Sequence, residues 1–349
     1  MTELLPAPLD PEGLVWEHFG RLPIFRLSNG LREAMLQNMH PGLAAGVEHH
    51  SVFFEDPRAR GERSIGPIMS VVYGGATSHE WGKLVRSFHG PIRGVDKYGR
   101  RYSALNPETF FWAHATFVED IVTGHELTGY PLSAADKEAL YLESIDWYRL
   151  YGVSMRPVPP DWDAFQQYWE HMINNVLEDS RPVREGFHMY RTMPPPTSKR
   201  LSDRANTVVG PLILKPLVQT PLVKLILWIT TGALPPVIRE RLCLDWTRLD
   251  ELRYRLHLKA VHAMIKGIPT HLQYFPLARD QRAQYHRTGT VAPIPLPTRN
   301  PHQSNRSPAL SATPRGNCSR DLSKTERADL HSAAWKAIDP RLGGASLST

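Results

Sequence analysis

Apolar residues recur along most of this chain at the three- and four-residue spacing of amphipathic helices. The clearest case begins at Thr77-Ser78, where one face carries Trp81, Leu84, Val85 and Phe88. A second helix is expected to open at Asn106-Pro107-Glu108, with one stripe formed by Phe110, His114, Phe117 and Ile121. Both stripes predict helices that bury one side against a shared core.

The same pattern predicts helices elsewhere. Asp10-Pro11-Glu12 has the cap, proline and acid of a helix start, and Ser133 to Asp136 resembles a capping box that opens a helix reaching Gly152. Other expected helices span 31–39, 63–74, 161–178, 235–242 and 247–266. No run alternates as a strand would, and no internal repeat is found. The sequence therefore predicts an all-α fold, built as a single large helical domain.

Two segments depart from this pattern. Residues 181–207 are polar and rich in proline, which predicts an exposed loop. Residues 211–229 are strongly apolar but include Lys215, Lys224 and three prolines, so they form a poor membrane span. A buried helix pair and a shallow peripheral contact with a membrane surface both remain open for this segment.

The C-terminal part changes the interpretation of the charge. From Arg279 onward the chain has 11 Lys and Arg against 5 Asp and Glu, a difference of +6 that equals the net charge of the whole chain. The body is therefore balanced, and we expect a solvated basic tail and no nucleic-acid partner. Because large apolar residues are scarce beyond residue 280, we expect a helical domain over 1–280 and a disordered tail over 281–349.

Cysteine usage and the N-terminus bear on localisation. Two cysteines, Cys243 and Cys318, cannot build a disulfide framework and lie in no zinc-binding spacing. The first residues, MTELLPAPLD, lack the basic start and apolar core of a signal peptide. We expect a cytoplasmic protein with no spanning helix, which associates with membranes at most peripherally.

Candidate chemistry concentrates in LVRSFHGPIRGVDKYGRRYSAL, residues 84–105. His89 lies at the edge of the buried stripe, Arg86 one turn before it, and Arg93 after a Gly-Pro turn. A half-buried imidazole is a good iron ligand, and guanidinium groups suit the propionates of a haem. A histidine satisfied by a backbone carbonyl is the alternative from spacing alone.

Two further stretches could contribute. In FFWAHATF, residues 110–117, His114 and Thr116 are explained either as core side chains or as pocket residues. In HHSVFFEDPRARGERS, residues 49–64, a group of arginines forms either a solvated turn or an anion pocket; these are Arg58, Arg60 and Arg63.

These stretches, taken in order, resemble the mpaB/rubber-oxygenase (latex-clearing protein) family of helical haem b oxygenases. The resemblance covers about residues 15 to 280 and is carried by MLQNMHPGLAAGVEHHSVFFEDPRARGERS (35–64), VVYGG (71–75), RSFHGPIRGVDKYGRRYSALNPETFFWAHATF (86–117) and LPPVIRERLCLDW (234–246). It implies globin-like helical packing around a haem pocket.

The resemblance also implies roles for individual residues. In the rubber-cleaving members a histidine with arginines three before and four after it is the axial iron ligand, and Arg86, His89 and Arg93 reproduce those offsets. Haem b would be the cofactor and His89 its metal ligand. Those members carry lysine and threonine on the distal side, where this chain has Arg63-Ser64, a departure. Arg63 and Thr116 are the candidate catalytic pocket residues.

The function implied is activation of dioxygen and its delivery to a hydrophobic substrate, as in oxidative cleavage of a carbon–carbon double bond in a prenyl or lipid chain. Two alternatives stand beside it. A non-catalytic haem or lipid carrier is favoured by the altered distal pair, and a helical interaction protein without cofactor would leave His89 and His114 purely structural.

Overall fold

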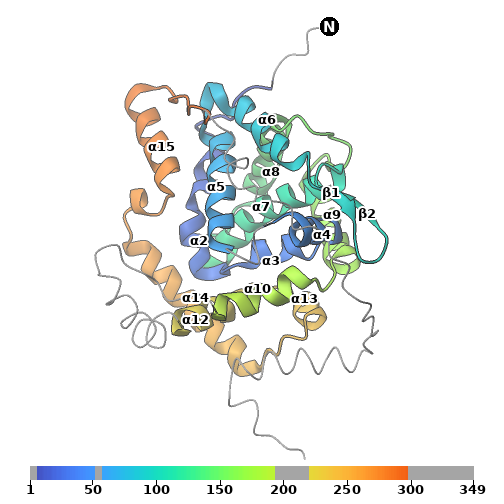
Figure 1. Cartoon of the computed structure of the whole chain (residues 1–349). Helices are drawn as coiled ribbons and strands as arrows, with labels where there is room; N and C mark the ends of the chain where they lie inside the picture. The colour runs from blue at the N-terminus through green and yellow to red at the C-terminus, as the bar shows by residue number, and fades with distance from the viewer. Residues whose placement is uncertain (1–5, 52–56, 193–219, 298–349) are drawn as a thin grey trace, which may run out of the picture.

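The structure, a computed structural model, describes residues 6–51, 57–192 and 220–297, with the side chains of 57–63, 187–192 and 220 outside the description. Within these ranges the all-α prediction is confirmed (Figure 1). The helices are α1 Leu14–His18, α2 Leu22–Asn29, α3 Arg32–Asn38, α4 Pro41–His50, α5 Pro57–Tyr73, α6 Ser78–His89, α7 Pro107–Thr128, α8 Ala134–Leu150, α9 Trp162–His171, α10 Arg181–Thr192, α12 Thr220–Ala233, α13 Pro236–Arg241, α14 Arg248–Gly267 and α15 Pro276–Thr288. Shorter turns of helix are η1 Phe19–Arg21, η3 Gly75–Thr77, η4 Met172–Val176 and η6 Thr270–Leu272.

The sequence did not predict the small antiparallel hairpin between α6 and α7. Strands β1, Arg93–Val95, and β2, Arg101–Ser103, pair with Arg93 opposite Ser103. Each strand has only three residues, too few for a visible alternation of apolar and polar positions. The hairpin leads directly away from the end of α6.

Helix α7 runs through the middle of the helical body and packs against α2, α3, α8 and α14. The Asn106 side chain caps its first turn by accepting from the backbone of Glu108 and Thr109, and Gly129 ends it at φ +81°. The predicted stripe is correct: Phe110, His114 and Ile121 are buried, and Phe117 is half-buried and packs against the core.

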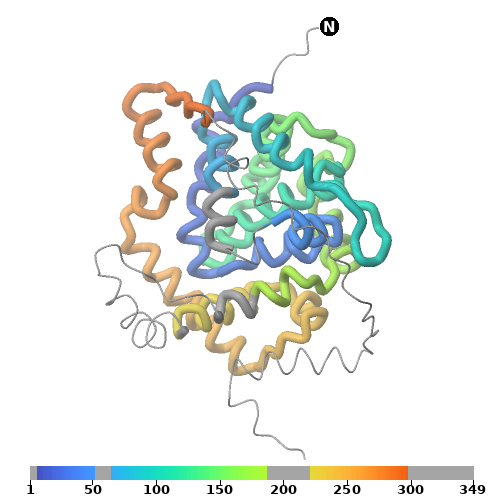
Figure 2. The backbone as a smooth tube through the Cα atoms, in the orientation of Figure 1, coloured from blue at the N-terminus to red at the C-terminus, as the bar shows by residue number. Residues whose placement is uncertain are grey.

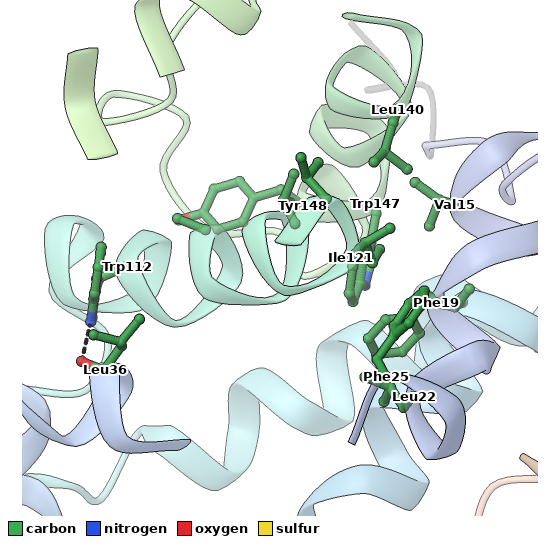
Figure 3. Close-up of a cluster of buried hydrophobic side chains, with 14 of the residues drawn as sticks. Val15, Phe19, Leu22, Phe25, Leu36, Trp112, Ile121, Leu140, Trp147 and Tyr148 are labelled. Atoms are coloured by element: carbon green, nitrogen blue, oxygen red, sulfur yellow. Dashed lines mark hydrogen bonds between the residues drawn. The ribbon is translucent and has the colours of Figure 1, made fainter. Parts of the chain in front are cut away.

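The core gathers large aromatic side chains around α7 (Figure 3). Trp112 donates its indole N–H to the Leu36 carbonyl at 3.1 Å, and Trp147 donates to the Tyr151 hydroxyl at 2.9 Å. A fully buried Leu or Phe contributes roughly 1.5–3 kcal/mol. Trp112 and Trp147 therefore add buried apolar area to this core while their polar edges stay hydrogen-bonded.

Helices α10, α12, α13 and α14 form a layer beneath the bundle (Figures 1 and 2). The loop expected over 181–207 is wrong for residues 181–192, which form α10, while 193–207 lie outside the description. Ser180 accepts from the Val183 backbone at 3.4 Å and Arg181 pairs with Glu185, so a cap and an i,i+4 pair start a helix where prolines indicated a loop.

The apolar segment expected over 211–229 is described only from residue 220, where α12 begins. On α12 Leu227 and Ile229 are buried, whereas Leu222 and Leu225 are exposed. Among the described helices, none has the length and apolar character needed to cross a bilayer.

Packed structure continues beyond the expected boundary at residue 280. That boundary falls inside α15, which packs against α5. The Ile294 carbonyl then accepts from Trp81 at 3.0 Å and from Thr77 at 2.9 Å. The packed body therefore reaches Ile294, and residues 298–349, on which most of the expected disorder falls, lie outside the description.

Candidate functional site

Helix α6 places the predicted iron ligand at its last position. Trp81 and Val85 face the core, and His89 follows them at the next turn of the same stripe, half-buried. The helix ends there: Gly90, its C-cap, keeps helical backbone angles, and Pro91 follows with no backbone N–H to continue the hydrogen-bond ladder. The histidine therefore lies where the buried face of α6 reaches the surface.

The ring of His89 is oriented by its own helix. Its Nδ1 lies 2.8 Å from the Val85 carbonyl oxygen, so the Nδ1–H donates to this carbonyl. The Phe110 ring packs edge-on against the imidazole, with the two ring centroids 5.4 Å apart. In the neutral ring, a donated Nδ1 proton leaves the lone pair on Nε2, as in histidines that ligate metals while a backbone carbonyl holds their other nitrogen.

Arg86 lies one turn before His89 and joins two helices. It is exposed, and its Nη1 donates to the Gly152 carbonyl at 2.8 Å, just beyond the C-terminus of α8. A guanidinium group is favourable at the negative end of a helix dipole. Arg86 thereby holds α6 against α8 while its charge stays at the surface.

Arg93 begins β1 and is also exposed. The Ile92 backbone N–H donates to the His89 carbonyl at 3.1 Å, and Ala104 donates to the Ile92 carbonyl at 2.9 Å. This tight turn brings Arg93 to the same corner as His89. In the described part of the chain Arg93 makes no ion pair.

A polar cluster beside this hairpin was missed from the sequence. The Tyr102 hydroxyl, on β2, lies 2.7 Å from His49 Nδ1 and 3.2 Å from His50 Nε2, both on the last turn of α4. Burial, and secondly Glu48, raises the pKa of Tyr102. His49, His50 and Tyr102 are visible in the sequence, but about fifty residues separate the histidines from the tyrosine, so local spacing does not reveal their contact.

Thr116 lies on another side of α7, away from this corner. Its hydroxyl donates to the Ala113 carbonyl at 2.7 Å and accepts from Gln37 of α3 at 2.8 Å, and it is buried. Six residues along a helix separate it from Phe110 by about 9 Å of rise and by about 120° around the helix axis, one-third of a turn. The structure does not bring Thr116 to His89, and its catalytic role stays a prediction.

His114 is part of the aromatic core. Its Nε2–H donates to the Ser144 carbonyl at 3.0 Å, and Trp147 and Tyr148 pack against the ring. Burial lowers the pKa of His114 to about 3. The structural interpretation of this histidine therefore fits the contacts. The other distal candidate, Arg63, has its backbone in α5, and its side chain, like those of Arg58 and Arg60, lies outside the description.

Buried charges next to Thr116 form a second feature that spacing did not reveal. Arg32 of α3 makes a bidentate ion pair with Glu119 of α7, with one contact at 2.7 Å. Asp120, fully buried, accepts from the Asn29 side chain at 2.8 Å, and burial raises its carboxyl pKa. These contacts tie α2 and α3 to α7.

Comparison with known proteins shows which relatives and which family this chain is similar to. Two uncharacterized proteins, from Mycobacterium bovis and Mycobacterium tuberculosis, are each 25% identical over 246 residues, which is 67% of this chain and 87% of the relative. No solved structure matches the chain significantly. Residues 16–263 match the family model for the catalytic domain of the ER-bound oxygenase mpaB/B′/rubber oxygenase family. Because that match covers well over half of the chain, this protein belongs to the mpaB/rubber-oxygenase family and carries its oxygenase-type catalytic domain.

Proposed function

We propose that the chain is a haem b-dependent oxygenase that acts on a hydrophobic substrate, with His89 as the axial ligand of the iron. The carrying observation is the orientation of His89, whose Nδ1–H donates to the Val85 carbonyl at 2.8 Å. That contact selects the tautomer in which Nε2 is the coordinating nitrogen. Phe110 supplies an apolar neighbour to the ring.

The two arginines fit the anionic edge of a porphyrin. Arg93 and Arg86 are exposed at the corner where α6 ends, on either side of His89 in the sequence. Guanidinium groups form charge-assisted, often bidentate hydrogen bonds with carboxylates. We expect Arg93 to contribute more than Arg86 to binding the propionates, since Arg86 already donates to the Gly152 carbonyl.

When bound, haem would supply the dioxygen chemistry. The chain's own residues would hold the imidazole in one tautomer, neutralise the propionates and keep water from the apolar side of the ring. We propose cleavage of a carbon–carbon double bond in a prenyl or lipid chain as the reaction. The family membership supports an oxygenase, and the substrate class is our extension.

The test is the absorption spectrum of the purified full-length chain, as isolated and after addition of hemin. We expect a Soret band that His89→Ala abolishes, with the matched control His79→Ala, on the first turn of the same helix, keeping it. A wild-type chain that takes up no haem, or a His89→Ala protein with an unchanged band, would overturn the assignment.

One observation favours a second function, a haem or lipid carrier without catalysis: Arg63-Ser64 stands where rubber-cleaving members have lysine and threonine. Oxygen consumption separates the two functions. The haem-loaded chain should consume oxygen with a polyprenyl or unsaturated lipid if it is an enzyme. A haem-loaded chain that binds these lipids without consuming oxygen would be a carrier.

A further inference from the structure

Helix α14 carries two apolar faces, and within the described residues only one of them is buried. Tyr254, Val261 and Ile265 are buried and point into the protein. Leucines on the same helix remain open to solvent, with exposed fractions of 52% for Leu249, 55% for Leu252 and 56% for Leu256. A surface helix of a globular protein ordinarily has polar residues on its outer side.

The exposed leucines form a continuous strip. At about 100° per residue, Leu249, Leu252, Leu256 and Ala263 all lie within roughly 40° of the direction opposite Tyr254. The outer surface of α14 is therefore apolar over its N-terminal part, from Leu249 to Leu256, and Lys259 borders this apolar part. We call Leu249, Leu252 and Leu256 the outer leucine strip.

Basic residues line one side of this strip. On the same geometry Arg248, Arg255, Lys259 and Lys266 fall about 100–140° from Tyr254, on a single flank. Within α14 five basic residues face two acidic ones, Asp250 and Glu251, a net charge of 5 − 2 = +3. Only Arg255 is neutralised on the helix itself, by Glu251 at 2.9 Å.

The surroundings extend the apolar character. Among the described residues, twelve large apolar side chains are exposed, and seven of them belong to 220–272, the layer of α12 and α14. Besides the strip they are Leu222, Leu225, Met264 and Leu272. Figure 1 shows α12 and α14 together at the lower side of the molecule, and the two helices are in contact.

We propose that the outer leucine strip and its basic flank dock this protein on an anionic lipid bilayer. An interfacial helix of this kind buries leucines at the level of the headgroups while its lysines and arginines contact lipid phosphates. The charge favours a membrane over a second copy of the chain, because a symmetric dimer through α14 would bring two +3 helices together. The proposal is independent of the haem assignment.

The proposal is tested by sedimentation of the full chain with vesicles of phosphatidylcholine alone or with phosphatidylserine added. We expect binding to the anionic vesicles that weakens as salt rises. Leu252→Ser with Leu256→Ser should lower partitioning about tenfold or more. Lys259→Glu with Lys266→Glu should do the same on anionic vesicles, since each surface cation contributes about fivefold.

Leu142→Ser, at an exposed leucine on α8, is the matched control and should bind like the wild type. Circular dichroism establishes that each variant is folded. Equal binding by the wild type and both double variants, or no binding by the wild type, would overturn the proposal. A concentration-dependent dimer that the Leu252→Ser, Leu256→Ser variant dissociates, without vesicle binding, would assign the strip to a second copy instead.

Discussion

Gly82 of α6 touches the backbone of α8 at Leu150: a Cβ added at Gly82 would lie 2.0 Å from the Leu150 carbonyl oxygen. The two helices are therefore in backbone contact about two turns before His89. This approach also brings Arg86 within 2.8 Å of the Gly152 carbonyl. The position of the candidate iron ligand thus depends on a residue with no side chain.

Replacement of Gly82 by alanine is expected to destabilise the protein by at least about 2 kcal/mol, because a methyl group cannot share space with a carbonyl oxygen. Urea unfolding gives the change. Gly66→Ala, in α5, is the control, since a Cβ there meets nothing within 4 Å and alanine should stabilise the helix by about 0.5–1 kcal/mol. Similar losses in both variants would contradict the backbone contact.

Loss of Arg93 is expected to weaken haem binding about tenfold, the value of one charge-assisted hydrogen bond to a carboxylate. Hemin titration of Arg93→Ala, followed at the Soret band, measures this. Arg101→Ala is matched to it, because Arg101 is an exposed arginine of the same hairpin on the opposite strand. An equal effect of both substitutions would indicate a general charge effect and would remove Arg93 from the site.

The buried ion pair between Arg32 and Glu119 predicts a large stability loss on substitution of one partner. Arg32→Met should cost about 3–5 kcal/mol, because it leaves the Glu119 carboxylate partly buried and unpaired. Adding Glu119→Gln should recover part of this loss. Arg149→Ala, from the exposed pair with Asp146, should cost less than about 0.5 kcal/mol. Denaturant midpoints of the wild type and the three variants measure these changes in unfolding free energy. A loss of under 1 kcal/mol for Arg32→Met, about the size of an exposed pair, would contradict a strong buried pair.

Buried histidines predict that stability falls with acidification. The pKa of His114 is lowered to about 3 by burial, and that of His18 to about 3 by burial and then by His125. The unfolded chain binds protons below about pH 6.5 whereas the folded chain does not, so stability is complete above that pH and is lost toward pH 3.

The pH slope of the unfolding free energy tests this directly. Each such histidine contributes up to about 1.4 kcal/mol per pH unit between pH 6 and 4. His114→Phe should reduce the slope by about that amount, and His271→Phe, at an exposed position, should leave it unchanged. An unaltered slope in His114→Phe would show that its ring titrates normally in the folded protein.

Part of the candidate site could be predicted from local sequence, and part could not. The helix stripe of Trp81 and Val85 correctly placed His89 at the end of α6, because periodicity and a Gly-Pro stop act within a few residues. The bond of Arg86 to Gly152 spans 66 residues, and nothing in the spacing indicates it. The same holds for Tyr102 and its two histidines.

Errors in the prediction have physical causes. Composition favoured a loop over 181–192, but the Ser180 cap, the Arg181–Glu185 pair and packing on α12 and α4 form a helix, and the proline in its first turn is compatible with a helix start. A boundary at residue 280 followed from falling apolar content, yet Ile294 is bound through its backbone carbonyl, which composition does not reveal. Backbone hydrogen bonds are invisible in side-chain statistics.

What the sequence by itself determined is the helical class, the capped starts of α7 and α8, the position of α14, and the grouping of Arg86, His89 and Arg93, since each depends on neighbours within two turns. Only the tertiary structure decided that Arg86 donates to the Gly152 carbonyl, that Thr116 faces α3, and that α14 keeps a leucine strip outside the core. Those outcomes depend on which helices meet, and long-range packing sets that choice.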